Sequence, residues 1–186
     1  MDALENILFR NSTNRLERPY PNKKEMELVY KSALRAPDHR SLKPSRFIEI
    51  TDKGRDKLSN IFEIYAKENI KDLTEQQLNK YKKAPFRAPM IIVLVSDIKK
   101  HPKVPEVEQI LSTGATAQNI LLALNALGYG CIWRTGVFAL NKKINNYFYL
   151  KSNQIILGYL YVGTATGEKK KLITENQKDF VTIWDN

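Results

Sequence analysis

Apolar residues recur along this chain at two spacings, and each spacing predicts a different kind of element. Leucine and isoleucine at helical spacing predict a short helix over residues 2–9. Asn22 with Glu25 three residues later is a capping-box sequence, and the helix that it opens ends before Pro37. Further helices are predicted over 53–69, from Thr74 with Gln77 as its capping partner, over 105–127 and over 141–149.

Other segments have the composition of strands. Residues 90–95 are apolar at every position, which is typical of a central strand covered by helices on both faces. The mixture of such a strand with amphipathic helices predicts a layered fold. The apolar segment 180–184 is also strand-like, and such a chain end is usually held on its own domain or on a partner subunit. Three further strands are predicted over 46–51, 130–134 and 155–164.

Length and composition favour a single domain over residues 1–186. At this size roughly 70% of the unfolded surface can be buried on folding, so a core can form without disulfides or metals. No internal repeat, low-complexity stretch or Gly/Ser linker divides the chain. The net charge of +10 leaves a basic nucleic-acid-binding domain open as an alternative. However, the lysines are scattered with acidic residues between them, which favours a solvated surface.

The cysteine content and the amino-terminal sequence bear on the compartment. Cys131 is the single cysteine, so an intramolecular disulfide is impossible and a reducing compartment is expected. Asp2 and Glu5 stand where a signal peptide would carry positive charge. No apolar run reaches the roughly 18 residues of a membrane span. We therefore expect a cytoplasmic protein.

Two separated segments offer groups that bind anions. Arg10, Asn11 and Ser12 follow the first predicted helix, and a guanidinium with a nearby hydroxyl can hold one phosphate. Arg35 lies at the end of the second helix, and Pro37 presents His39 on the turn that follows. Each pattern also has a structural interpretation, because Arg35 can complement the helix dipole and His39 can bond a carbonyl.

A third segment, 128–136, is rich in glycine and follows the long apolar helix. Gly128 is placed as the C-terminal cap of that helix. Trp133, Arg134 and Thr135 come after one short strand, and this combination can line a planar ring and its polar edge, although Trp133 can equally be a core residue. The glycines do not match a dinucleotide fingerprint, because they follow a helix and no third glycine opens another one.

Other chemistries are poorly supported. With two histidines and one cysteine in an apolar run, neither a zinc site nor a cysteine nucleophile is expected. No phosphate-binding Gly-x-x-x-x-Gly-Lys-Ser/Thr loop, Gly-x-Ser-x-Gly elbow or kinase motif occurs. A cofactor that supplies its own chemistry is the remaining interpretation.

The order of these motifs resembles the FMN-dependent nitroreductase family over nearly the whole chain. The resemblance rests on Arg10-x-Ser12, Arg35-Ala36-Pro37-Asp38-His39-x-Ser41-x-x-Pro44, Ala84-Pro85-Phe86-Arg87-Ala88-Pro89, and Gly128-Tyr129-Gly130-x-Ile132-Trp133-Arg134-Thr135-Gly136. It implies an α+β fold, with a central and mostly antiparallel sheet wrapped by helices, assembled as an intertwined homodimer. FMN would then lie at the dimer interface, so that each site draws residues from both chains.

The resemblance also implies roles for residues. Arg10, Asn11 and Ser12 would hold the phosphate and ribityl side of FMN. Trp133, Arg134 and Thr135 would line the flavin, and Arg35 and His39 would complete the pocket from the partner chain. Lys43 and Ser45 depart from the Gln and Trp of similar chains, and Lys43 could alter the redox potential or the choice of acceptor.

The implied activity is ping-pong hydride transfer through flavin N5, from NAD(P)H to an acceptor such as a nitroaromatic or quinone. Such a reaction needs no protein acid, base or nucleophile, and no metal. A flavin-binding or flavin-storing module with little turnover would share the same site, so it remains an alternative to the enzyme.

Overall fold

A five-stranded antiparallel sheet organises the chain in the computed structural model, which describes residues 2–167, 171, 172 and 174–185. The strand order is β1-β5-β3-β2, and β4 also pairs with β5. Residues 159–162 of β5 pair with both β3 and β4, so these two strands lie on opposite edges of β5. The strands are β1 (Leu16–Glu17), β2 (Ser45–Thr51), β3 (Met90–Asp97), β4 (Gly130–Arg134) and β5 (Gln154–Ala165).

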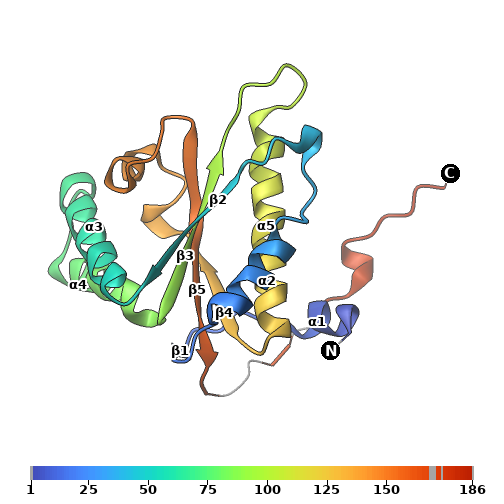
Figure 1. Cartoon of the computed structure of the whole chain (residues 1–186), viewed down its shortest axis with the longest axis horizontal. Coiled ribbons are helices and arrows are strands. Elements are labelled where there is room, and N and C mark those ends of the chain that lie inside the picture. Colours follow the sequence, from blue (N-terminus) through green and yellow to red (C-terminus); the bar gives the residue numbers. More distant parts are fainter. Residues whose placement is uncertain (1, 168–170, 173, 186) are drawn as a thin grey trace.

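Helices cover both faces of this sheet (Figure 1). On one face α2 (Lys23–Ala33) and α5 (Glu106–Ala126) pack side by side, and on the other lie α3 (Lys53–Asn69) and α4 (Glu75–Lys83). The fold confirms the predicted α+β class with an antiparallel sheet wrapped by helices.

The strand β3 shows why its sequence is apolar at successive positions. Ile91 and Val93 pack in the core on the α3 side, whereas Met90 and Ile92 pack against α2 and α5. Because successive side chains of a strand point to opposite faces, a strand covered on both sides must be apolar at every position. The predicted central strand is confirmed.

Helix ends follow the predicted capping chemistry. The side chain of Asn22 accepts from the Glu25 N–H, and the Glu25 carboxylate accepts from the Asn22 N–H. Thr74 and Gln77 form the same reciprocal pair at the start of α4. The segment predicted as a helix over 141–149 is a 3-10 helix over Lys142–Phe148. The other short helices are α1 (Ala3–Phe9), η1 (His39–Ser41), η2 (Ala84–Arg87), η3 (Gly136–Phe138) and η5 (Gln177–Asp179).

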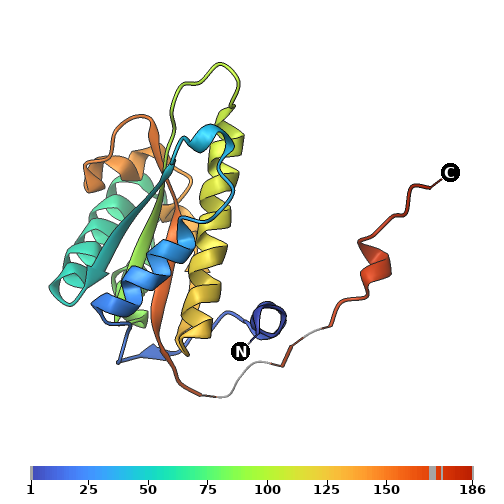
Figure 2. The same ribbon diagram turned by 45° about the vertical axis from the view of Figure 1, so that its right-hand side comes forward.

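The carboxyl-terminal segment leaves the body of the molecule (Figure 2). Residues 180–184 are not in a strand, and their large side chains are exposed, with Trp184 91% accessible. Within this one chain the apolar end is therefore not held on the sheet of its own domain.

No helix of the described part of the chain has the length and apolar character needed to cross a membrane.

Candidate functional site

A cavity of about 680 Å³ opens where the first loop meets the end of α5 and the start of β4. Loop 10–15 forms one wall, and the turn from α5 into β4 and the end of β5 form the others. All three residues of the predicted phosphate-binding segment line it. The lining residues are Phe9, Arg10, Asn11, Ser12, Thr13, Asn14, Arg15, Leu121, Asn125, Gly128, Tyr129, Gly130, Cys131, Ala165, Thr166 and Gly167.

Hydrogen bonds hold loop 10–15, here called the cavity loop, in place. The Arg10 N–H donates to the Asn6 carbonyl at the end of α1, and the Asn6 side chain donates to the Leu122 carbonyl of α5 at 3.0 Å. The Thr13 N–H donates to the Cys131 carbonyl of β4 at 3.2 Å. The loop is thus connected to a core helix and to the sheet, so its backbone geometry is set by the fold.

Arg10 is the chemically conspicuous residue of this loop. It is half-buried, and its Nη1 atom is fully buried with no hydrogen-bond partner among the described residues. A buried guanidinium nitrogen normally has an acceptor, because leaving it unpaired costs free energy. An anion bound in the cavity would supply the missing acceptor, and phosphate suits the guanidinium geometry.

Cys131 lies beside Arg10 and is buried. Burial raises the pKa of its thiol well above the usual value, and the nearby Arg10 charge opposes that rise only in part. The thiol is therefore protonated at neutral pH, which agrees with the predicted buried and unreactive cysteine.

The turn from α5 to β4 is a Schellman motif that shapes the cavity. The Gly128 N–H donates to the Asn125 carbonyl at 3.0 Å, and the Tyr129 N–H donates to the Leu124 carbonyl at 2.9 Å. Gly128 has φ +85°, which favours glycine, so its predicted role as the helix cap is confirmed. At Gly130 an added Cβ would lie 2.7 Å from Leu16 Cδ2, so a larger residue there would require the Leu16 side chain to move.

Trp133 and Arg134 point to opposite faces of β4. The Trp133 indole packs with apolar residues on the α2 and α5 side, and its N–H donates to the Leu157 carbonyl at 3.2 Å. The Arg134 guanidinium lies 5.6 Å from the Tyr161 ring on the α3 side and donates to Asn14 Oδ1 at 3.1 Å. Arg134 thus contacts the cavity loop, and its buried Nε has no partner among the described residues.

Thr135 follows Arg134 as an exposed residue at the end of β4, before η3. Burial raises the pKa of Tyr161 to about 12, although the charges of Arg134 and Arg87 oppose that rise. The Tyr161 hydroxyl therefore stays protonated at neutral pH beneath the Arg134 guanidinium.

Arg35 and His39 lie elsewhere in the chain. Arg35 follows α2 and is exposed. The Pro37 carbonyl accepts from the Ser112 hydroxyl at 2.7 Å, and His39 Nδ1 lies 2.6 Å from the Glu108 carboxylate. These contacts place the Arg35–His39 segment beside the first turns of α5.

The Arg10 loop and the segment of His39 are attached to different parts of α5, so their separation can be estimated along this helix. The cavity loop is joined to α5 through Leu122, whereas His39 contacts Glu108, fourteen positions earlier. At 1.5 Å per residue this is about 20 Å along the helix. Figure 1 shows α1 near one end of α5 and the segment after α2 near the other. Within one chain, therefore, His39 does not meet the Arg10 cavity, and Arg35 is not among the residues that line it.

Some lining residues were not identified from the sequence. Asn14, Thr166 and Gly167 line the cavity, and Asn14 also accepts from Arg134. Asn14 lies in the same polar loop as Arg10, and this closeness in the sequence could have identified it as a site residue. Thr166 and Gly167 follow the last strand, and the Thr166 N–H donates to the Arg15 carbonyl of the loop at 3.1 Å, next to the pairing of β1 with β5.

The fold and the cavity together define an α+β protein with a pocket at the end of its sheet into which the loop of Arg10 is built. The Nitroreductase family model matches residues 7–164. The chain is 35% identical over 164 residues to the Escherichia coli (strain K12) protein named "Putative NAD(P)H nitroreductase YdjA", covering 88% of each. It is 32% identical over 184 residues to a Haemophilus influenzae protein named "Putative NAD(P)H nitroreductase", covering 98% of this chain and 99% of that one. The chain belongs to the nitroreductase family, as its motifs indicated.

Solved structures agree with the fold. A nitroreductase-like family protein from Bacillus cereus superposes with a TM-score of 0.84 at 20% identity, covering 100% of this chain and 97% of that one. A nitroreductase with bound FMN from Bacteroides fragilis superposes with a TM-score of 0.76 at 17% identity, covering both chains completely.

Proposed function

We propose that the chain is an FMN-dependent NAD(P)H oxidoreductase that reduces a nitroaromatic, a quinone or a related acceptor. The observation that carries this proposal is the buried and unpaired Nη1 atom of Arg10 in the cavity. Membership of the nitroreductase family and the names of the relatives support the same reaction class. The cytoplasmic location expected from the sequence stays a prediction.

The residues present fit an FMN phosphate. Arg10 offers a guanidinium nitrogen without an acceptor, Ser12 offers a hydroxyl beside it, and Asn11 lines the same wall. Arg134 and Thr135 follow on β4, where Arg134 already bonds the cavity loop. Trp133 stabilises β4, because its indole is packed against Leu157 and Gly158 of β5.

When bound, FMN supplies hydride exchange at its N5 atom, taking two electrons and one proton from NAD(P)H and passing them to the acceptor. The protein groups bind, orient and tune the charge around the ring. No side chain is needed as acid, base or nucleophile.

The functional unit is a homodimer with a site shared between chains. Within one chain, the α5 residues that contact His39 and Asn6 lie about 20 Å apart along the helix, so a pocket containing both His39 and Arg10 requires a second copy. Three exposed apolar surfaces are available for such an assembly: the tail 180–184, Leu4 and Leu8 of α1, and Val107 and Leu111 of α5. Apolar surface of this extent supports an interface.

The absorbance spectrum of the purified protein tests this proposal. We expect a yellow protein with flavin absorbance that is bleached by NADH or NADPH and restored by a nitroaromatic acceptor. Colourless protein that takes up no added FMN would contradict it. Bound flavin with negligible steady-state oxidation of NAD(P)H would instead support the flavin-storage alternative.

A further inference from the structure

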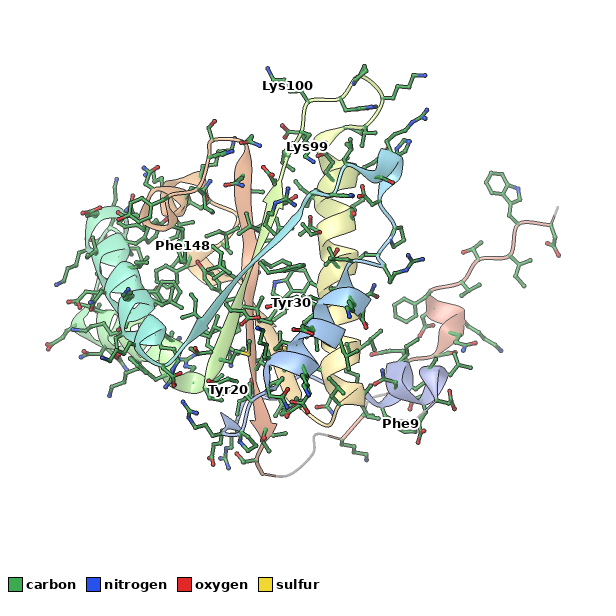
Figure 3. All side chains as sticks on the ribbon, viewed as in Figure 1. Phe9, Tyr20, Tyr30, Lys99, Lys100 and Phe148 are labelled. Atoms are coloured by element: carbon green, nitrogen blue, oxygen red, sulfur yellow. The ribbon has the colours of Figure 1, made fainter. Side chains whose placement is uncertain are left out.

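One end of the molecule carries an unusual density of positive charge. Residues 38–46 and 97–103, here called the cationic end, contain six Lys or Arg and two Asp. Figure 3 labels Lys99 and Lys100 at this end, above the tip of the sheet. The six cations are Arg40, Lys43, Arg46, Lys99, Lys100 and Lys103.

Contacts between the two segments make the cationic end one surface. The Lys99 ammonium donates to the Leu42 carbonyl, and the Asp97 N–H donates to the Pro44 carbonyl at 2.7 Å. The side chain of Gln109, in α5, accepts from the Lys99 N–H at 2.9 Å and donates to the Lys99 carbonyl at 2.8 Å. The loop after β3 is therefore held beside the η1 segment.

The acidic residues of this end are already engaged. The Asp38 carboxylate accepts from the Leu42 and Lys43 N–H groups at 3.0 and 2.7 Å. Asp97 lies 3.3 Å from the Arg46 guanidinium and also accepts from Asn153. In the described part of the chain, no hydrogen bond or ion pair engages the side chains of Arg40, Lys43, Lys100 and Lys103, which are exposed.

The backbone under these cations is held in an uncommon conformation. Arg40, Ser41 and Lys43 all have positive φ, at 61°, 50° and 51°. Non-glycine residues adopt such angles at a cost, which the Asp38 carboxylate offsets by bonding two N–H groups of the turn. The turn thus fixes the backbone from which Arg40 and Lys43 project.

We propose that the cationic end binds the phosphate-bearing adenosine half of the reduced dinucleotide and so favours NADPH over NADH. This inference rests on the proposed function, in which His39 closes the FMN site of a partner chain. His39 begins the η1 segment, and four residues of chain reach at most about 14 Å, so Lys43 lies close to that site. The dinucleotides differ only in the 2′-phosphate, a group with close to two negative charges.

A direct binding measurement separates recognition of this phosphate from turnover. The probes are 2′,5′-ADP, which carries the 2′-phosphate, and 5′-AMP, which lacks it, titrated calorimetrically into the FMN-loaded protein. We expect 2′,5′-ADP to bind at least about tenfold more tightly, because charge-assisted hydrogen bonds are the strong ones. In the variant Lys100→Gln with Lys103→Gln that preference falls toward one.

Steady-state kinetics give the second readout and the matched control. The ratio of kcat/KM for NADPH to that for NADH should fall about tenfold in the Lys100→Gln, Lys103→Gln variant, mainly through KM for NADPH. Lys53→Gln with Lys57→Gln removes the same charge from exposed positions of α3 and should keep the wild-type ratio. The difference between wild type and variant should shrink at high salt.

The outcomes distinguish two failures. Normal flavin content and turnover with an unchanged ratio in the Lys100→Gln, Lys103→Gln variant would overturn this inference alone. An equal loss in both variants would also overturn it, because net charge and not position would then set the preference. Absence of flavin and of turnover with either dinucleotide would overturn the proposed function, and this inference with it.

Discussion

The two ends of α5 hold positive charge in different environments. At the Leu122 end, the Arg10 guanidinium is half-buried in a cavity and lacks an acceptor. At the Glu108 end, the cationic end is exposed, and the side chains of Lys43, Lys100 and Lys103 are accessible to solvent. Desolvation makes an unpaired group costly and a specific ligand correspondingly favourable, whereas water screens exposed charges. We therefore expect the cavity to bind FMN tightly and the cationic end to discriminate NADPH from NADH.

The largest effect is expected where the sheet supports the cavity. At Gly158, with φ +150°, an added Cβ would lie 2.1 Å from Trp133 Nε1 and 2.9 Å from the Arg134 carbonyl. Gly158→Ala should therefore force β4 from its place and lower the free energy of unfolding by about 3 kcal/mol. Chemical denaturation followed by circular dichroism measures this.

The matched control for that variant is Gly114→Ala. Nothing lies within 4 Å of a Cβ built at Gly114, which is inside α5, so alanine there should be neutral or stabilise by up to about 1 kcal/mol. Equal stability of Gly158→Ala and wild type would mean that β4 does not depend on this close approach.

The next largest effect is expected on FMN affinity, and it distinguishes the buried Arg10 from exposed positive charge elsewhere on the molecule. Arg10→Ala removes the buried guanidinium, so we expect FMN affinity to fall about 10- to 100-fold. Fluorescence titration of apoprotein with FMN measures the change. Lys57→Ala removes the same charge at an exposed position and should leave the affinity as in the wild type. Equal affinity in all three proteins would place the phosphate elsewhere.

A mixing experiment tests whether the two ends meet across subunits. Arg10→Ala and His39→Ala chains are co-expressed with different tags, and the heterodimer is isolated. If each site takes Arg10 from one chain and His39 from the other, one site per heterodimer is intact and one carries both changes. We expect high-affinity FMN binding at half the wild-type stoichiometry. The absence of any intact site, with Arg10→Ala at one and His39→Ala at the other, would show that both residues come from one chain.

The smallest effect is expected at an exposed ion pair far from both ends. Glu63 lies 2.7 Å from Lys67 and 3.0 Å from Lys82, and these partners lower its pKa. A lowered pKa stabilises the fold above the unfolded value, and this contribution is lost as pH falls through the folded value. Glu63→Gln should lower the thermal midpoint slightly at pH 7 and not below the folded pKa. A large difference at pH 7 would contradict the view that solvent screens such pairs.

Local chemistry made much of the fold predictable from the sequence. Asn22, Thr74 and Gly128 set helix ends through short-range hydrogen bonds, so their roles were correctly read from neighbouring residues. The apolar run of β3 likewise reported its burial on both faces. Strand β1 was missed because two residues, Leu16–Glu17, show no periodicity and are fixed only by pairing with the end of β5.

The candidate site was less predictable because it depends on distant segments. Arg10–Ser12 was predicted to be an anion-binding loop and lines the cavity, but the contact of Arg134 with Asn14 links residues 120 positions apart. The packing of the Trp133 indole against Gly158 also follows from the pairing of β4 with β5. The separation of His39 from Arg10 depends on how both segments dock on α5, which no local pattern encodes.

The length of α5 has a consequence for how this chain tolerates insertions and deletions. One residue inserted between Ser112 and Leu122 would rotate one end of the helix against the other by about 100° and displace it by about 1.5 Å. The Ser112 contact with Pro37 and the Leu122 contact with Asn6 could not then both persist. Engineered changes of length therefore belong outside α5, since α5 keeps its two ends in register.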